Sequence, residues 1–180
     1  MGKGFDILKI KNGKFMRGVN DMEYDCSFTQ ENKWFRYRAA AIIIEDGYVL
    51  FAGNEKDSYY YSIGGGVHIG ESAEEAVKRE VFEETGVEYE VERLAFIHEN
   101  FFTGDGSLMG KQCHEIALYF LMKSRRTREL HSNSYTQGVK ENMYWLPIDK
   151  LGDYRAYPMF FRDKLNNLKS EIEHIVTYEI

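Results

Sequence analysis

The clearest pattern of apolar and polar positions lies between Ser72 and Gly86, where apolar residues recur every three or four positions. This spacing is typical of one face of an α-helix. Ser72 is a favourable N-cap, and Glu75 three residues later completes a capping box. Gly86 supplies the glycine at which many helices end. The sequence therefore predicts a helix from Ala73 to Thr85.

The same helix carries acidic side chains where apolar ones are expected. On a helical wheel at about 100° per residue, the apolar stripe is formed by Ala73, Ala76, Val77 and Val81. Glu80 and Glu84 fall inside this stripe, and Glu83 lies beside it. The opposite, solvated face consists of Glu74, Glu75, Lys78 and Thr85. Clustered carboxylates repel one another and are costly to bury unpaired. A solvated acidic face is the simpler interpretation, but the wheel favours a bound divalent cation, because Mg²⁺ takes oxygen ligands.

Apolar runs and alternating segments predict strands on both sides of this helix. They cover residues 24–31, 33–44, 48–52, 59–63, 88–100, 112–123 and 141–147. Asp46-Gly47 is a hairpin signal, residues 64–66 are expected to form a turn, and residues 101–111 a glycine-rich loop near the substrate. Pro158, which suits the first position of a helix, is expected to open a second helix that runs to about Lys169.

This order of elements predicts a single α/β domain of 180 residues, with a mixed sheet between helices. A hydrophobic content of 43% is enough for a sizeable core. Residues 1–22 are the least informative part and are interpreted as an N-terminal extension or a short strand.

Composition narrows the functional classes. A net charge of −6 and a pI near 5.5 argue against general nucleic-acid binding, and the only basic run is at residues 125–128. Cys26 and Cys113 do not suggest a disulfide framework and are interpreted as reduced packing residues. The N-terminus lacks the apolar run of a signal peptide, and no segment approaches membrane-spanning length. A cytoplasmic protein without membrane contact is therefore expected.

Residues 65–87 resemble the Nudix box. The matching positions are Gly65, Glu71, Arg79-Glu80-Val81, Glu83-Glu84, Gly86 and Val87, without a gap. One departure precedes the box, where Gly64-Gly65-Gly66 stands in place of the Pro-Gly-Gly of many family members. The resemblance implies a Nudix-type α/β/α sandwich. It also implies an Mg²⁺- or Mn²⁺-dependent pyrophosphohydrolase that acts on a nucleoside diphosphate linked to another group.

The helix carboxylates are the expected metal ligands. Glu80 and Glu84 lie one turn apart on the same face, with Glu83 beside them. A backbone carbonyl of Gly64 or Gly65 is expected to join them. By resemblance, Glu83 orients or deprotonates the attacking water.

Arg79 and Glu71 are expected to support this site. Arg79 lies next to Glu83 on the wheel, which favours an ion pair that orients Glu83. The family resemblance implies that Arg79 also meets Glu71, which helix spacing alone does not indicate. The alternative is that both residues are ordinary surface charges.

Two acidic residues outside the helix are candidate general bases. Glu115 lies in an otherwise apolar strand, where an inward carboxylate is costly unless it binds a metal or a partner. An outward position at an edge is the alternative. Glu141 lies at a loop-to-strand junction where several relatives carry a catalytic or metal-binding acid, although exposed Glu is common in loops.

Three functions fit the sequence. Hydrolysis of a nucleotide derivative is favoured, because Arg79, Glu80, Glu83 and Glu84 are all present. A catalytically silent Nudix-like nucleotide-binding or regulatory module is the second, and such relatives often lose box carboxylates. Isomerisation of a prenyl diphosphate is the third, and it rests only on Cys113 near Glu115.

Aromatic residues give weaker indications. Those near the predicted site are Tyr59, Tyr60, Tyr61, Phe101 and Phe102, which are candidates for stacking on a base, with core packing as the alternative. Phe82 falls on the polar side of the predicted helix and must be covered by another segment or a second subunit. A homodimer is therefore a further hypothesis. The sequence carries no marker that identifies the substrate.

Overall fold

The computed structural model describes residues 24–53, 58–132, 135–136, 139–140 and 142–179. The expectations for residues 1–22 and for Glu141 lie outside this part of the chain.

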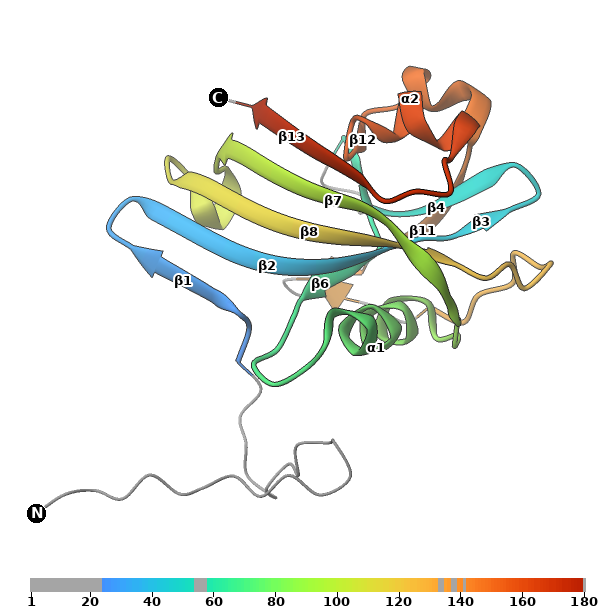
Figure 1. Ribbon diagram of the computed structural model, residues 1–180, viewed down its shortest axis with the longest axis horizontal. Coiled ribbons are helices and arrows are strands. Elements are labelled where there is room, and N and C mark those ends of the chain that lie inside the picture. Colours follow the sequence, from blue (N-terminus) through green and yellow to red (C-terminus); the bar gives the residue numbers. More distant parts are fainter. Residues whose placement is uncertain (1–23, 54–57, 133–134, 137–138, 141, 180) are drawn as a thin grey trace, which may run out of the picture.

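The larger sheet of the described chain is mixed, and its path runs β1-β2-β8-β7-β13 (Figure 1). Its strands are β1 (Ser27–Gln30), β2 (Lys33–Ile42), β8 (Gln112–Met122), β7 (Val91–Thr103) and β13 (Glu173–Glu179). A short strand, β6 (Gly64–Gly66), pairs with β2 outside this path. Strand β2 runs parallel to β8 and β13 runs parallel to β7, whereas β7 and β8 are antiparallel. The apolar end of β2 is buried on both faces, as its continuous apolar run predicts.

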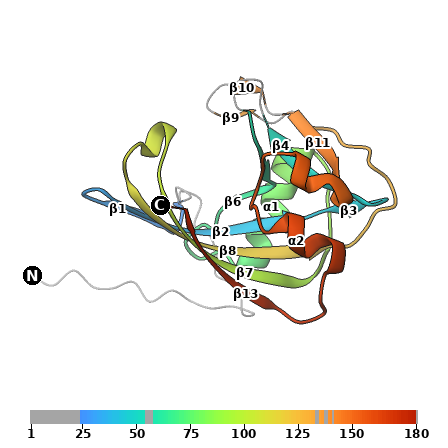
Figure 2. The same ribbon diagram turned by 90° about the horizontal axis from the view of Figure 1, so that it is seen from above.

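A smaller sheet follows the order β11-β4-β5-β12, with β3 paired to β4. Its strands are β3 (Ile44–Glu45), β4 (Tyr48–Gly53), β5 (Tyr60–Ser62), β11 (Asn142–Pro147) and β12 (Ala156–Tyr157). The remaining elements are η1 (Gly106–Leu108), η2 (Ile148–Asp153), α2 (Phe161–Lys164), η3 (Leu165–Asn167) and the hairpin of β9 (Tyr135–Thr136) and β10 (Val139–Lys140). Seen from above, β4 and β11 lie across the molecule from β7 and β13 (Figure 2).

Two cores hold these layers together. Helix α1 (Ala73–Thr85) buries Ala76, Val77 and Val81 against one face of the larger sheet, where Ala39 and Ala41 of β2 meet them. On the other face, the smaller sheet and α2 enclose a second apolar cluster. The predicted α/β sandwich is therefore confirmed: α1 covers one face of the mixed sheet, and the smaller sheet with α2 covers the other.

The predicted first helix is confirmed at Ala73–Thr85, but the second is wrong in length and start. Pro158 follows directly on β12, and a turn separates it from the first helical residue, Phe161. Helix α2 has only four residues before the chain tightens into η3. Phe161 and Leu165 are buried, so tertiary packing holds this segment.

Four further expectations are corrected by the structure. Residues 64–66 form strand β6 and not a turn, because they pair with β2. Phe101 and Phe102 lie in β7 and not in a loop, because they pair with His114 and Cys113 of β8. Strands β12 and β13 were not expected, since the last predicted strand is the one at residues 141–147.

The fourth correction concerns Thr85, which is fully buried and not on a solvated face of α1. Its Oγ1 donates a hydrogen bond to the carbonyl of Val81. The hydroxyl is thereby satisfied within the helix, so the side chain can be buried at low cost.

Cys26 and Cys113 are both free thiols. Within the described residues, no helix is long and apolar enough to cross a membrane. The cytoplasmic location stays a prediction.

Candidate active site

The bounds of α1 are set by local signals at both ends. Ser72 Oγ accepts a hydrogen bond from the backbone N–H of Glu75 at 3.2 Å, and the Glu75 carboxylate accepts one from the Ser72 N–H at 3.0 Å. Gly86 ends the helix in the left-handed region, with φ of 69°. With its apolar stripe fixed on β2, the helix directs Glu80 and Glu84 toward the glycine strand β6.

Strand β6 must be glycine because the chain around it leaves no space. Gly64 has φ of 135°, and a Cβ there would lie 2.3 Å from the carbonyl oxygen of Ala39. A Cβ on Gly65 would lie 2.5 to 2.6 Å from the carboxylate atoms of Glu80. The backbone of β6 therefore lies directly against a helix carboxylate, with no side chain between them.

The three helix carboxylates occupy different environments. Glu84 Oε1 accepts a hydrogen bond of 2.7 Å from the backbone N–H of Gly64. Glu80 accepts one from Arg79 Nη1, and burial raises the pKa of Glu80 although Arg79 acts in the opposite direction. Glu83 lies at the rim, with 56% of its side chain exposed. Glu80 and Glu84 thus face β6, and Glu83 faces solvent beside them.

Arg79 connects the helix to the loop before it. Its Nε and Nη2 donate to the two carboxylate oxygens of Glu71, each at 3.0 Å, and Nη2 also donates to the carbonyl of Gly66. Its Nη1 lies 3.3 Å from Glu83 Oε2. Burial raises the pKa of Glu71, but hydrogen bonds from Arg79 and from the His68 N–H outweigh it, so the pKa is lowered. The structure therefore places Arg79 and Glu71 in one ion pair and not on an open surface.

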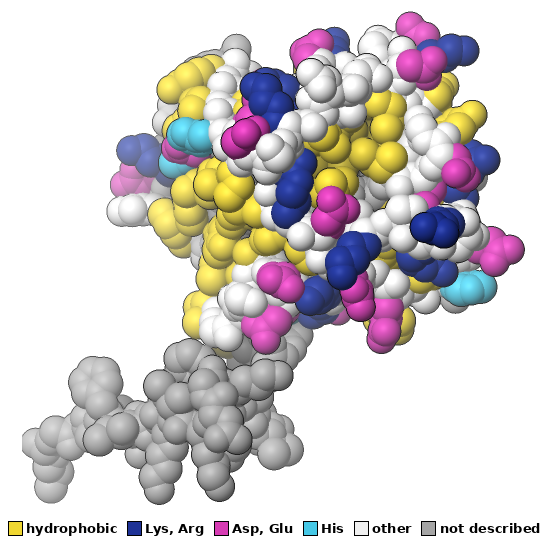
Figure 3. All heavy atoms as spheres, turned by 45° about the vertical axis from the view of Figure 1, so that its right-hand side comes forward, with side chains coloured by type: hydrophobic (Ala, Val, Ile, Leu, Met, Phe, Trp, Pro, Cys, Tyr) yellow, Lys and Arg dark blue, Asp and Glu magenta, His cyan; other side chains and the backbone are white. Residues whose placement is uncertain are grey.

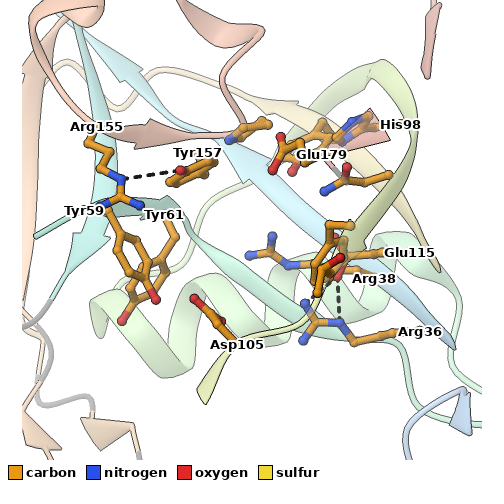
Figure 4. Close-up of a pocket in the computed structure, with 15 residues that line it drawn as sticks. Arg36, Arg38, Tyr59, Tyr61, His98, Asp105, Glu115, Arg155, Tyr157 and Glu179 are labelled. Carbon is orange, nitrogen blue, oxygen red and sulfur yellow. Dashed lines mark hydrogen bonds and ion pairs between the residues drawn. The ribbon is translucent and has the colours of Figure 1, made fainter. Parts of the chain in front are cut away.

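A cavity of about 410 Å³, called here the chamber, lies between the larger sheet and β5 and β12. Figure 4 shows Tyr59, Tyr61, Arg155 and Tyr157 on one side of it and Arg36, Arg38 and Glu115 on the other. Arg38 joins the chamber to the box, because its Nη2 donates to the carbonyls of Ser62 at 2.7 Å and Gly64 at 3.0 Å.

Glu115 points into the chamber and is buried. Its Oε2 accepts hydrogen bonds from both Nε, at 2.8 Å, and Nη2 of Arg36. Burial raises the pKa of Glu115, but the charges of Arg36 and Arg38 outweigh it and the pKa is lowered. Glu115 lies on the face of β8 opposite α1, because Leu118 packs in the core on the α1 side. The structure thus brings Glu115 to the chamber and not to the helix carboxylates.

Three tyrosines form an aromatic wall of the chamber. The ring of Tyr59 lies 6.1 Å from that of Tyr61 and 5.8 Å from that of Tyr157, and the Arg155 guanidinium lies 5.8 Å from the Tyr59 ring centre. Phe102 lines the chamber as well. The other two stacking candidates do not. Tyr60 packs on Tyr144 in the core, and Phe101 lies on the opposite face of the sheet.

Sequence reasoning missed Arg36, Arg38, Arg155 and Tyr157. A signal was present for the first two, because arginines two positions apart in a strand point to the same face. Two cations on one face of a buried strand indicate a polar cavity. Arg155 and Tyr157 carried no local signal, since β12 enters the site only through its parallel pairing with β5.

His98, a buried chamber residue, is expected to make the fold acid-sensitive. Burial lowers its pKa from 6.5 to about 4, and the nearby Glu115 charge offsets this only in part. The unfolded chain therefore takes up the proton first, so stability falls as pH drops from about 6.5 toward 4. In His98→Gln this part of the loss should disappear, as measured by thermal unfolding between pH 7.5 and 4.5. The exposed His131→Gln is the control, and an equal change there would contradict the assignment.

The model of the NUDIX domain matches residues 34–165, which is most of the chain. The chain belongs to the NUDIX domain family. It is therefore a Nudix hydrolase, as the box implied, and Nudix hydrolases generally act on derivatives of nucleoside diphosphates.

Solved structures agree with the Nudix fold. The MutT protein of Bacillus halodurans has a TM-score of 0.62 at 18% identity, over 79% of this chain and 89% of that chain. The MutT protein of Methanosarcina mazei Go1 has a TM-score of 0.56 at 22% identity, over 75% and 92%. At such identities the likeness shows the fold alone. No curated protein matches this sequence.

Nudix hydrolases typically use divalent metals such as Mg²⁺. Among the described residues, no three His, Cys, Asp or Glu side chains converge as a metal-binding group. Even so, the donor chemistry at β6 fits such an ion. Glu80 and Glu84 supply hard oxygens against a glycine backbone that leaves no side chain between them.

Proposed function

We propose that this Nudix hydrolase is a metal-dependent pyrophosphohydrolase that cleaves a nucleoside diphosphate linked to another moiety. The observation that carries the proposal is the contact of the Glu80 carboxylate with Gly65, at a position that a Cβ would fill. Burying a carboxylate against bare backbone is costly without a compensating cation. The ion pair with Arg79 compensates part of the charge on Glu80, but the carboxylate of Glu84 beside it adds a second negative charge.

Glu80 and Glu84 are the proposed ligands for Mg²⁺ or Mn²⁺, with Glu83 at the rim as the third. For the backbone ligand, the strand register favours Gly64 over Gly65. Hydrogen bonds from Ala41 N–H to Ile63 and from Val67 N–H to Tyr37 alternate along β6 and β2. This alternation turns the Gly65 carbonyl toward β2 and the Gly64 carbonyl outward.

When bound, the metal neutralises charge on the diphosphate oxygens and lowers the pKa of water. Glu83 is the proposed group that orients the attacking water and accepts its proton. The water oxygen forms a bond to one phosphorus atom, and the bond from that phosphorus to the bridging oxygen breaks. The bridging oxygen leaves on the second phosphate. Arg79, itself held by its ion pair with Glu71, positions Glu80 and Glu83 through hydrogen bonds from Nη1.

The other two acidic candidates are less suited to accept the proton from water. Glu115 is hydrogen-bonded to Arg36 on the opposite face of the sheet, so we assign it to substrate binding in the chamber. Glu141 stays a candidate base from the sequence alone.

The chamber is the proposed site for the nucleoside of the substrate. Base stacking on aromatic rings contributes about 1–3 kcal/mol per base, and Tyr59, Tyr61 and Tyr157 supply the rings. Arg38 lies between this wall and Gly64, so a substrate held there presents its diphosphate to β6.

The test is release of mononucleotide from a panel of substrates with Mg²⁺ or Mn²⁺. The panel contains ADP-ribose, NADH, diadenosine polyphosphates, sugar nucleotides and oxidised nucleoside triphosphates. At least one member should be cleaved to a nucleoside monophosphate and a phosphorylated remainder, and chelation should stop the reaction. Tight binding without turnover across the panel would replace the hydrolase by a silent nucleotide-binding module.

A further inference from the structure

One oxygen of Glu115 is left open in the wall of the chamber. Glu115 is only 6% exposed, and it lines the chamber, where Figure 4 shows its carboxylate. Both hydrogen bonds from Arg36 end on Oε2. Among the described residues, no group donates a hydrogen bond to Oε1. A buried carboxylate oxygen without a donor is costly, so this atom is suited to a ligand that brings one.

The charge on Glu115 decides which groups of a ligand can approach it. Burial raises its pKa, but the charges of Arg36 and Arg38 outweigh burial, so the carboxylate is ionised at neutral pH. An ionised carboxylate accepts hydrogen bonds and donates none. A phosphate or carbonyl oxygen of a ligand would therefore be repelled at Oε1, and an N–H or O–H group would be attracted.

Opposite charges also lie side by side on the outside of the molecule. On the face drawn in Figure 3, the Lys and Arg side chains lie among Asp and Glu side chains and do not gather into one basic area. Charge on this face gives an anionic ligand no preferred position. Short-range contacts inside the chamber are therefore the better source of selectivity.

The aromatic wall determines which part of a nucleoside meets Oε1. Tyr59 and Tyr157 lie on one side of the chamber and Glu115 lies on the other (Figure 4). The planes of the two rings differ by 87°, so the rings cannot both turn their faces toward Glu115. A base that stacks on the ring lying edge-on to Glu115 directs its own edge across the chamber. The group nearest Oε1 is then a donor on the edge of the base.

An exocyclic amino group is the donor that suits this oxygen best. Adenine, guanine and cytosine each carry one, and its nitrogen projects beyond the neighbouring ring atoms. Hypoxanthine and uracil have a ring N–H instead, which lies beside a projecting carbonyl oxygen. That carbonyl would approach the negative charge on Oε1, and such repulsion discriminates between ligands. An amino base is thus favoured by the bond it gains and by the repulsion it avoids.

We propose that Glu115 selects a nucleotide whose base carries an amino group, by accepting a hydrogen bond from that group at Oε1. The inference rests on the proposed function, which places the nucleoside in the chamber. It narrows the substrate class to derivatives of adenosine, guanosine or cytidine, and it disfavours derivatives of inosine and uridine.

The first test measures binding without hydrolysis. Nucleoside 5′-monophosphates have no anhydride bond to cleave, so their Kd can be measured by calorimetry on the full chain with Mg²⁺. At least one of AMP, GMP and CMP should bind about tenfold to a hundredfold more tightly than its counterpart without the amino group, which is IMP for the purines and UMP for CMP. Equal Kd values within every pair, or no binding of any monophosphate, would overturn the proposal.

The second test identifies the residue. In Glu115→Gln the amide oxygen can still accept from Arg36, so the fold should be kept, as checked by circular dichroism. The preference for the amino base should vanish, because the neutral amide can accept from an amino group or donate to a carbonyl. Asp105→Asn is the matched control, since Asp105 also lines the chamber but is exposed to water. A preference that survives in Glu115→Gln, or that Asp105→Asn removes, would contradict the assignment. The wild-type comparison decides the proposal even where the Gln variant is unstable.

Two further outcomes separate this inference from its alternatives. Amino-selective binding without cleavage of any substrate would support the inference and remove the hydrolase. Metal-dependent cleavage with equal Kd values within every pair would do the reverse. The ribose hydroxyls are the other donors of a nucleoside, and 2′-deoxy-AMP tests them. A loss of affinity for 2′-deoxy-AMP that disappears in Glu115→Gln would place the ribose at Oε1 and overturn the proposal.

Discussion

Glu84→Gln is expected to lower kcat by about a hundredfold to a thousandfold, which is typical for the loss of one preorganised electrostatic group. The amide oxygen of Gln can still accept the hydrogen bond from the Gly64 N–H, so the fold should be kept. What is lost is the negative charge that the proposed metal requires. The measurement is kcat as a function of Mg²⁺ concentration, with unfolding followed in parallel.

Glu74→Gln is the matched control for this variant. Glu74 lies on the same helix but is exposed, and its carboxylate pairs with Lys78 at 2.8 Å. Its activity should equal that of the wild type. An equal loss in both variants, or full activity in Glu84→Gln, would argue against Glu84 as a metal ligand.

Gly64→Ala is expected to destabilise the protein by about 3 kcal/mol or more, the range of severe core disruptions. The added Cβ would lie 2.3 Å from the Ala39 carbonyl oxygen and 2.6 Å from the Ala40 Cα. Both are backbone atoms of the buried strand β2 and cannot move aside. The value is obtained from chemical denaturation.

Gly70→Ala separates crowding from backbone conformation. Gly70 also has a positive φ, of 86°, but nothing lies within 4 Å of its missing Cβ. The Gly70→Ala variant should lose about 1–2 kcal/mol of unfolding free energy, the usual cost of the left-handed conformation for a residue with a side chain. Equal losses in the two variants would show that φ alone, and not the approach of β2, requires glycine at position 64.

Both predictions concern the same junction between α1 and β6. The helix contributes Glu80 and Glu84, the strand contributes backbone without side chains, and Arg79 binds the loop that joins them.

The sequence by itself determined what depends on near neighbours. The bounds of α1 follow from the capping box at Ser72 and the stop at Gly86, which are signals within a few residues. The Nudix box and the family follow from spacing along one segment. The wheel placed Glu80 and Glu84 on the packed side because helical periodicity is local. It misplaced Thr85, because a hydroxyl that bonds the preceding turn can be buried.

Only the tertiary structure decided what depends on distant pairing. Strand β13 is a strand because it pairs with β7, which lies about eighty residues earlier in the chain. Tyr157 and Arg155 reach the chamber through the β12–β5 pairing, and Glu115 meets Arg36 through the parallel pairing of β8 with β2. The local sequence of a strand does not show which other strand it will pair with. The free energy that stabilises these pairings comes from contacts between segments that are far apart in the sequence and meet only in the folded chain.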